Sequence, residues 1–316
     1  MAKLLEGKVA IVTGAGRGLG RGEALCLAQE GAKVVVNDVG GHFDGTGTGQ
    51  GPADEVVSEI KAAGGEAVAN YGSVSDFQAV KVMVDTAIEK FGQLNIIVNN
   101  AGILRDRMLF NMSEEEWDAV IAVHLKGTFN CIRHACGYWR EQHKAGNNLK
   151  GKLVNTVSDA GLLGNVGQTN YGAAKAAIAA LSMIVGREMS RYGVVSNCVA
   201  PMARTRLTTE ATPSMAGFMG AAVPEGQFDM QDPDNMAPLV AFLASDLADN
   251  VNGEVFRLLG NRVWLLRGWH NVDTVVKSEM SKWTPQELDS AVKGMLEKAG
   301  PQEDLTSMMM QAMGGG

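Results

Sequence analysis

The sequence has few cysteines and no metal-binding pattern. Its 316 residues include four cysteines, none of them in a CxxC pair, and its five histidines do not gather around them. Scattered thiols of this kind are typical of a reducing compartment, and they exclude a disulfide scaffold or a zinc site. The cysteines are Cys26, Cys131, Cys136 and Cys198. We therefore expect a cytoplasmic protein without a bound metal.

Long apolar runs and basic clusters are also missing. No stretch reaches the length that spans a bilayer, and the N-terminal "MAKLLEGKVAIVTG" enters a strand pattern without a signal-peptide cleavage site. The formal net charge is −7, and no basic run offers phosphate contacts. The sequence thus predicts neither a membrane nor a nucleic-acid partner. Its substrate should be a small molecule.

What the sequence does have is a regular alternation of short apolar runs and amphipathic segments. Continuous apolar runs spaced by helical patterns are typical of a parallel sheet covered on both faces. The expected strands are residues 8–14, 33–38, 66–71, 94–102, 152–158, 194–200 and 254–259. The expected helices are residues 20–31, 53–65, 76–92, 114–140, 170–192 and 233–246. The pattern predicts an α/β fold, a doubly wound seven-stranded parallel sheet of the Rossmann type.

The remaining segments suggest one domain with appendages. Residues 40–52 carry six glycines and should form a loop, and 142–151 is a polar connection. We expect residues 1–260 to form the domain, with a substrate lid near 201–230. Residues 261–316 should add a helical extension to the same domain, without a further strand. Two amphipathic pieces, 272–283 and 284–300, lie in this extension, and Thr284, Pro285 and Glu287 resemble a capped helix start.

The stretch "TGAGRGLG" (13–20) lies between the first strand and the first helix. Glycines there permit a tight turn and the approach of a pyrophosphate to the helix N-terminus. The glycines Gly14, Gly18 and Gly20 do not match the strict GxGxxG spacing, so a turn without a ligand remains an alternative.

Asp38 strengthens the prediction of a dinucleotide. It closes the second strand, where a carboxylate can accept hydrogen bonds from an adenosine ribose and would repel a 2′-phosphate. NAD is therefore favoured over NADP. Arg17 argues slightly the other way, because a basic residue in the turn suits a phosphate. A solvated acid at a strand end is the alternative interpretation of Asp38.

Tyr171 and Lys175 lie four residues apart in "NYGAAK" and face the same side of a predicted helix. Most such pairs are inert. Ser158, however, ends the fifth strand at the sheet edge where ligands sit. A nearby ammonium favours the phenolate and lowers the pKa of a tyrosine, which could then remove a hydroxyl proton while the serine holds the substrate oxygen.

Together, "TGAGRGLG", "NNAG", Ser158 and "YGAAK" resemble the classical short-chain dehydrogenase/reductase family over residues 6 to about 260. The resemblance implies that Tyr171 is the acid/base, Lys175 its modulator and Ser158 the anchor of the substrate oxygen. It also implies a cofactor site, to which Tyr171 and Lys175 contribute. The other cofactor residues would be Gly14, Arg17, Gly18, Leu19, Gly20, Asp38, Ser73, Val74, Asn99, Asn100, Ala101 and Gly102. The acidic residue that the family usually has near Ser73 is missing.

A finer resemblance points to one branch of the family. His124, in "HLKG", stands where the family has a catalytic asparagine, either as a packed side chain or as the holder of a relay water. With the loop after Asp38 and "NNAGILRDR", it is similar to the (3R)-hydroxyacyl-CoA dehydrogenase domains of peroxisomal multifunctional enzyme type 2 and their bacterial relatives. The tail "LLGNRVWLLRGWHNV" and Pro201–Met202 depart from the expected pattern, which leaves the substrate open.

The sequence thus predicts NAD-dependent oxidation of a 3-hydroxyacyl-CoA, in β-oxidation of a fatty or steroid side chain. The alternatives are a hydroxysteroid or other secondary-alcohol dehydrogenase, a 3-oxoacyl reductase, and a non-catalytic NAD-binding protein. Candidate contacts for the CoA phosphates are Arg105, Arg107, Arg204 and Arg206. The resemblance also implies a homodimer or homotetramer.

Overall fold

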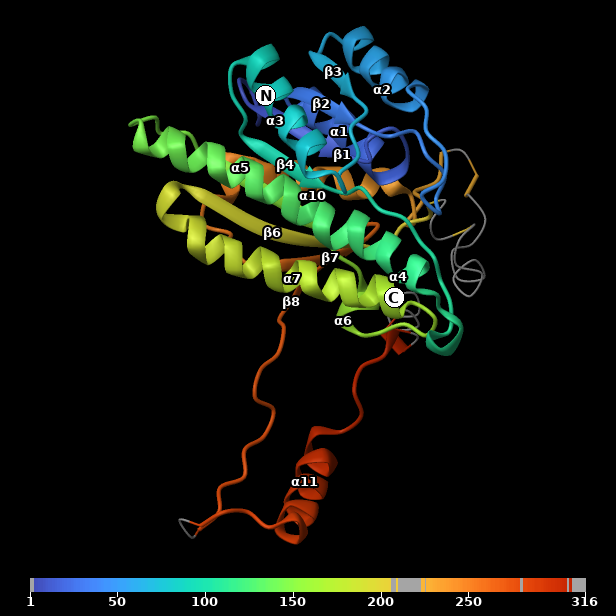
Figure 1. Cartoon of the computed structure of the whole chain (residues 1–316), viewed down its shortest axis with the longest axis vertical. Coiled ribbons are helices and arrows are strands. Elements are labelled where there is room, and N and C mark those ends of the chain that lie inside the picture. Colours follow the sequence, from blue (N-terminus) through green and yellow to red (C-terminus); the bar gives the residue numbers. More distant parts are fainter. Residues whose placement is uncertain are drawn as a thin grey trace. The chain divides into compact units, whose positions relative to one another are not determined.

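One eight-stranded sheet organises the chain, in the order β3-β2-β1-β4-β5-β6-β7-β8 (Figure 1). The computed structural model describes residues 3–205, 209, 223–224, 226–278, 281–305 and 307–308. The strands are β1 (Val9–Thr13), β2 (Lys33–Asn37), β3 (Ala67–Asn70), β4 (Ile96–Asn99), β5 (Gly151–Thr156), β6 (Val194–Pro201), β7 (Val255–Leu259) and β8 (Arg262–Leu266). The first seven pair in parallel, which confirms the predicted doubly wound core.

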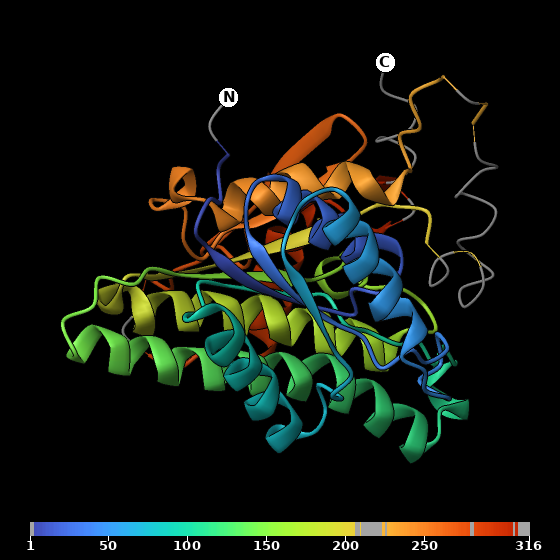
Figure 2. The same cartoon turned by 90° about the horizontal axis from the view of Figure 1, so that it is seen from above.

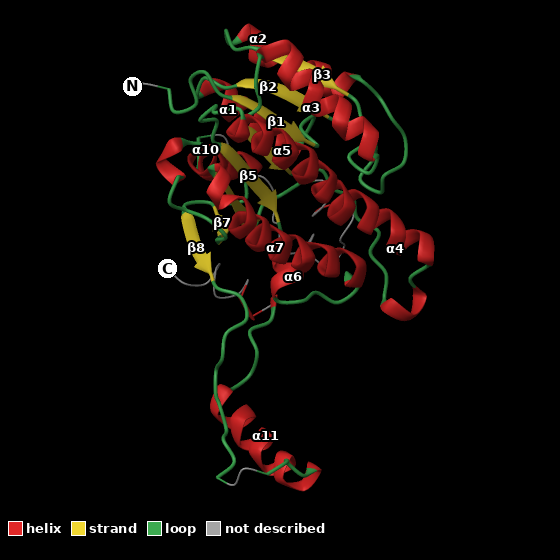
Figure 3. Cartoon of the chain, turned by 60° about the vertical axis from the view of Figure 1, so that its left-hand side comes forward, coloured by secondary structure: helices red, strands yellow, loops and turns green. Residues whose placement is uncertain are grey.

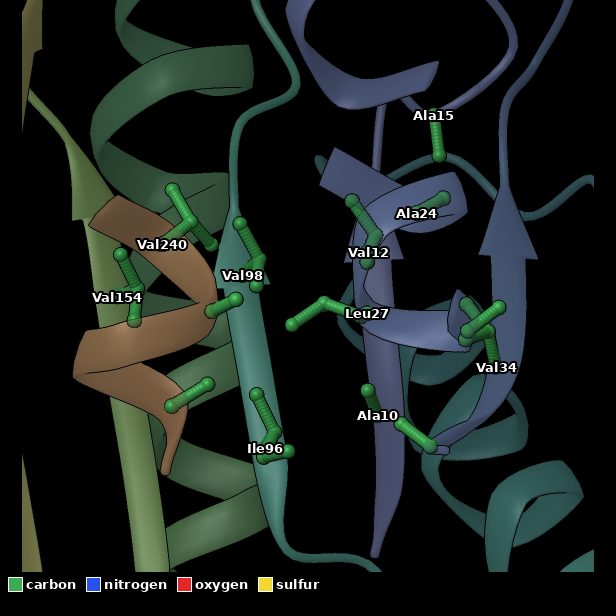
Figure 4. Close-up of a cluster of buried hydrophobic side chains, with 14 of the residues drawn as sticks. Ala10, Val12, Ala15, Ala24, Leu27, Val34, Ile96, Val98, Val154 and Val240 are labelled. Carbon is green, nitrogen blue, oxygen red and sulfur yellow. The ribbon is translucent and has the colours of Figure 1, made fainter. Parts of the chain in front are cut away.

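Helices cover both faces of this sheet (Figure 2). One face carries α1 (Gly18–Gln29), α2 (Gly51–Ala62) and α10 (Ala237–Ala244), whose apolar side chains pack on alternate residues of β1, β2 and β4. Figure 4 shows part of this cluster, with Ala24 and Leu27 of α1 and Val240 of α10. The other carries α3 (Phe77–Phe91), α5 (Gly127–Lys144) and α7 (Thr169–Met189). Before α5, α4 (Glu114–Ile121) continues through a π-helical turn, η2 (Ala122–Lys126). The short α6 (Asp159–Leu162) precedes α7.

Three-ten turns complete the described elements. They are η1 (Leu109–Asn111), η3 (Ser190–Tyr192), η4 (Pro233–Met236) and η5 (Asp246–Ala248). Among the described residues, every helix is too short or too polar to span a lipid bilayer.

The eighth strand corrects the sequence prediction, which expected no strand after Gly260. Strand β8 pairs with β7 in antiparallel register, and Leu259 lies opposite Arg262 (Figure 3). A two-residue connection makes this possible, because Gly260 adopts a positive φ of 57° that only glycine tolerates readily. The alternation of exposed and partly buried residues in "RVWLL" is the signal for a strand with one side turned to solvent.

The chain divides into two compact units, residues 1–266 and 267–316. The second unit contains α11 (Pro285–Ala299), which begins at the expected cap: the Thr284 hydroxyl accepts the Glu287 N–H, and the Glu287 carboxylate accepts the Thr284 N–H. The described residues of the other predicted amphipathic piece, 272–283, form no helix. The capping box thus marks the piece that is helical.

Candidate active site

The glycine turn is shaped by contacts that leave no room for side chains. A Cβ on Gly20 would lie 2.4 Å from both the Gly14 oxygen and the Asn100 Nδ2. Gly14 itself has a φ of 63°. The backbone of the turn is therefore packed against the end of β4, and its open side can approach a ligand closely.

The start of α1 has unused hydrogen-bond donors. Its N-cap is Arg17, which makes no side-chain cap hydrogen bond, and the first turn contains no acidic residue. Free N–H groups and the helix dipole at such an end favour a phosphate. The cradle that a Cβ would fill and this uncapped end together fit a dinucleotide pyrophosphate.

Asp38 holds the turn from the neighbouring strand. Its Oδ2 accepts the Gly16 N–H at 2.8 Å, and its Oδ1 accepts the Gly40 N–H at 2.7 Å. Each carboxylate oxygen has a second lone pair, so the side chain can still accept hydrogen bonds from a ribose diol. Asp38 thus has a structural task that the sequence interpretation did not include.

The residues after β4 are tied to the glycine turn. Asn100 donates from Nδ2 to the Thr13 and Gly14 carbonyls at 3.0 and 3.1 Å. The backbone N–H groups of Asn100 and Ala101 both donate to the Thr13 hydroxyl at 3.1 Å. The buried Asn99 side chain donates from Nδ2 to Asn155 Oδ1 at 2.8 Å, and this hydrogen bond links the ends of β4 and β5.

The other predicted cofactor residues lie along the same edge. Leu19, in the first turn of α1, packs against the hydrophobic core, and Arg17 is exposed. Ser73 hydrogen-bonds the Ser75 hydroxyl at 2.8 Å, while Val74 is buried and its carbonyl accepts from Asn130. Their role toward adenine stays a prediction.

Ser158 and Tyr171 are brought together by a close contact between α6 and α7. A Cβ on Gly161 would lie 2.6 Å from the Ala176 nitrogen, and one on Gly172 would lie 2.9 Å from the Ala160 oxygen. This contact lets Ser158, the N-cap of α6, reach the Tyr171 hydroxyl with a hydrogen bond. The Ser158 oxygen accepts the Ala160 N–H at 3.2 Å, so its own proton is free to be donated.

The pKa of Tyr171 differs from the sequence expectation. Burial raises it to about 12, the Ser158 hydrogen bond opposes this rise, and the Asp106 and Asp159 carboxylates add to it. The Lys175 Nζ lies 5.6 Å from the centroid of the phenol ring. Burial dominates the shift, so the net effect on the pKa of the phenol in the protein alone is upward, and the modulating role of Lys175 stays a prediction.

Lys175 is buried at 3% exposure and donates to the Thr156 carbonyl at 2.6 Å. Burial lowers its pKa to about 7, while Cys198 and Glu23 oppose the lowering. An ammonium with such a pKa gains and loses its proton near neutral pH, which suits a proton carrier.

His124 lies in the π-helical turn and stacks edge-on against Tyr171, with ring centroids 5.1 Å apart. Its Nε2 contacts the Ile103 carbonyl at 2.8 Å and the Ile103 N–H at 3.1 Å, and a Cβ on Gly102 would lie 2.4 Å from its ring. Burial lowers its pKa to about 3. His124 is therefore neutral, and any part in a proton relay must use hydrogen bonds and not titration.

The predicted CoA contacts are only partly described. The Arg105 Nε donates to the Asp44 carbonyl at 2.9 Å, and the Arg107 Nε lies 3.2 Å from Glu116. Arg204 forms an ion pair with Asp229. Arg206 and most of the predicted lid lie outside the described residues.

Three buried ionisable residues, Asp159, Arg257 and Glu23, escaped the sequence interpretation. Asp159, next to Ser158, pairs with Arg257 of β7, and Glu23 is 1% exposed with no hydrogen-bond partner for either carboxylate oxygen in the described structure. Burial raises the pKa of Glu23 to about 8. The available signal was a charged residue within an apolar strand or helix face, as in "EVFRLL".

Comparisons with known proteins agree with this geometry. The family model for short chain dehydrogenases matches residues 8–216. A hydroxyacyl-CoA dehydrogenase of Mycobacterium tuberculosis, ChsB1, is 46% identical over 97% of this chain and 95% of its own length. A crystal structure of a short chain dehydrogenase from Mycobacterium avium is 46% identical, with a TM-score of 0.83 over 95% of this chain and 98% of that one.

A multidomain relative matches in the same region. The mouse peroxisomal multifunctional enzyme type 2 is 38% identical over 89% of this chain, which corresponds to 35% of the mouse protein. The chain thus spans about a third of that relative.

Proposed function

Because the chain belongs to the short chain dehydrogenase family, we propose that this oxidoreductase converts a 3-hydroxyacyl-CoA to the 3-oxoacyl-CoA with NAD as the acceptor. The acyl chain would be a fatty chain or a steroid side chain undergoing β-oxidation. The observation that carries the substrate class is the 46% identity, over almost the whole of both chains, to a hydroxyacyl-CoA dehydrogenase.

In this proposal, Ser158 and Tyr171 hold the substrate hydroxyl between them. Ser158 donates a hydrogen bond and Tyr171 removes the hydroxyl proton as hydride leaves the same carbon. The bound oxidised nicotinamide supplies the hydride acceptor and a positive charge. A positive charge lowers the pKa of a neighbouring phenol, which offsets the effect of burial on Tyr171.

Lys175 would pass the proton onward. Its pKa of about 7 leaves a large fraction of the amine neutral near neutral pH, so it can accept a proton and is charged afterwards. The neutral His124 would orient the Tyr171 ring by its edge-on contact.

The choice of NAD over NADP rests on Asp38. Its carboxylate stands at the end of β2 beside the glycine turn, where it would repel a 2′-phosphate.

The free cysteines support a reducing compartment, and we propose that the protein is cytoplasmic. We propose a homodimer or homotetramer, a state that light scattering during size-exclusion chromatography tests.

The first experiment is NADH formation by the purified chain with (3R)-hydroxyacyl-CoAs of short, long and steroid-like chains, beside free hydroxysteroids and simple secondary alcohols. Activity limited to CoA thioesters is expected, and the preferred chain length identifies the substrate. Activity on free steroids or alcohols alone would refute the acyl-CoA assignment and leave the family assignment intact. Comparison of NADH oxidation with 3-oxoacyl-CoAs tests the reductase alternative.

A further inference from the structure

A buried ion pair involves Asp159, the residue that follows Ser158 in the chain. The Arg257 guanidinium donates from Nε to Oδ1 of Asp159 at 2.8 Å, and its Nη2 lies 2.7 Å from the same oxygen. The two side chains are 5% and 6% exposed. The partners are 98 positions apart in the sequence, so only the folded sheet brings them together.

Arg257 occupies a position where a lone charge would be unfavourable. In the sheet it lies between Ala200 of β6 and Trp264 of β8. A guanidinium between such neighbours has lost its hydration, and only an opposing charge with good geometry compensates for that loss. Asp159 supplies that charge, and the small Ala200 leaves space for the long side chain.

The pair is mechanically connected to the reacting hydroxyls. Asp159 is the first residue of α6 and directly follows Ser158. On its far side, α6 contacts α7 so closely that a Cβ on Gly161 would lie 2.8 Å from the Lys175 Cβ. The turn is thus held between β7 and α7, and a displaced Asp159 would move Ser158 away from Tyr171.

The pair also belongs to the charges around the phenol. The titratable and charged groups that face Tyr171 in the described structure are Lys175 on its own helix, His124 on η2, Asp106 after β4, and Asp159 on α6 with Arg257 behind it. Asp159 alone disfavours the phenolate. Arg257 is paired with that carboxylate, and its opposite charge reduces the net field of Asp159 at the phenol.

We propose that Arg257 and Asp159 are positioning residues of the reaction: their pair fixes the α6 turn so that Ser158 faces Tyr171, and their opposite charges balance beside the phenol. This inference rests on the proposed function, in which Tyr171 takes the substrate proton. Neither residue touches the substrate. The pair affects the position of the Ser158 hydroxyl and the ionisation of the Tyr171 hydroxyl.

Four variants of the full chain separate the effect of the ion pair on the position of Ser158 from the effect of its charges on Tyr171. Asp159→Asn leaves the arginine charge alone, and Arg257→Gln leaves the carboxylate alone. The double variant, Asp159→Asn with Arg257→Gln, restores a neutral pair that can still hydrogen-bond. Arg257→Lys keeps the charge but loses the planar fork that binds a carboxylate.

The first readout is the ionisation of Tyr171, measured as tyrosinate absorbance against Tyr171→Phe at each pH, without substrate. We expect Asp159→Asn to lower the pKa of the phenol by about one unit and Arg257→Gln to raise it by about one unit. The double variant should return close to the wild-type value. Arg257→Lys should leave the titration in place, because the charge is unchanged.

The second readout is kcat against pH with (3R)-hydroxydecanoyl-CoA. The acid limb should follow the phenol, to lower pH in Asp159→Asn and to higher pH in Arg257→Gln. Arg257→Lys should lower kcat several-fold at every pH with little change in KM, because Ser158 is less well held.

Shifts in the same direction in both single variants, or no shift in Asp159→Asn, would overturn the proposal. If Arg257→Gln does not fold, Asp159→Asn, Arg257→Lys and the double variant still decide it. The proposed function fails separately, through full turnover in Tyr171→Phe. An inactive Tyr171→Phe with unshifted Asp159→Asn refutes the ion-pair inference alone.

Discussion

The two halves of the site are built from different materials. The half around the glycine turn consists of backbone held by short hydrogen bonds, such as those from Gly16 and Gly40 to Asp38. The half around Tyr171 consists of buried side chains with shifted pKa values, among them Lys175 and His124. The glycine turn acts through the shape of its backbone, against which a ligand can pack. The half around Tyr171 acts through the protonation and charge of its side chains.

This difference teaches where each half is vulnerable. The glycine turn should lose ligand binding when a side-chain atom is added, because its closely packed backbone has no space for that atom. The half around Tyr171 should change its pH dependence when one of its coupled charges is neutralised, because the remaining groups then titrate at a different pH. Substitutions in the two halves should therefore leave different signatures, in binding for one and in pH dependence and turnover for the other.

The largest effect should come from Tyr171→Phe, which removes the proposed proton acceptor and keeps the ring. Loss of a general base lowers turnover by roughly 10²–10⁴-fold. NADH fluorescence titration should show that cofactor affinity stays within about twofold, a limit set by the unchanged cradle. An equal loss of affinity and turnover would contradict the division into two halves.

Gly20→Ala should be next, and it should act on binding. The added methyl would meet the Gly14 oxygen and Asn100 Nδ2 at 2.4 Å, so the turn must shift. Overpacking of this kind costs about 1–3 kcal/mol, and we expect the KM for the cofactor to rise about tenfold or more. The measurement is cofactor KM together with the midpoint of thermal unfolding.

Gly294→Ala is the matched control for that substitution. Gly294 also lies inside a helix, α11, but nothing lies within 4 Å of its added Cβ. Alanine should there stabilise by about 0.5–1 kcal/mol and leave the cofactor KM unchanged.

Asp38→Asn should change which cofactor is preferred. The amide keeps the size of the side chain but removes the charge that repels a 2′-phosphate. The ratio of kcat/KM for NAD to that for NADP should fall by about tenfold. Loss of activity with both cofactors in equal proportion would mean that Asp38 acts only by holding Gly16.

The smallest effect on turnover should come from Glu23→Gln, whose effect on folding stability should grow with pH. The pKa of Glu23 is raised to about 8 in the folded chain, from 4.5, so the unfolded chain loses this proton first. Folding stability therefore falls as pH rises from 4.5 to 8, and glutamine removes that loss.

Urea unfolding of Glu23→Gln and the wild type at pH 5 and pH 9 measures this difference. The stability advantage of the variant should grow by about 4 kcal/mol between pH 5 and pH 9. Glu23 and Lys175 influence each other's pKa, so Glu23→Gln also lowers the pKa of Lys175, and the difference between the two proteins reports on the coupled pair. A constant difference at the two pH values would show that Glu23 titrates normally.

Particular residues show how far prediction from sequence reached. Gly14, Gly18 and Gly20 were identifiable because a tight turn needs glycine whatever surrounds it, and the parallel core followed from the apolar runs. Strand β8 was missed because its pattern is short and half exposed, and its pairing depends on β7. The Arg257–Asp159 pair was missed because no local pattern joins residues so far apart.

By itself, the sequence determined the seven parallel strands, the glycine turn and the candidate set of Ser158, Tyr171 and Lys175, since each depends on periodicity or on spacing along the chain. Only the tertiary structure decided the ionisation of that set. The pKa values of Tyr171 and Lys175 follow from how much water the surrounding chain removes and from charges brought close by folding. Burial is a property of the assembled core, and no window of sequence contains it.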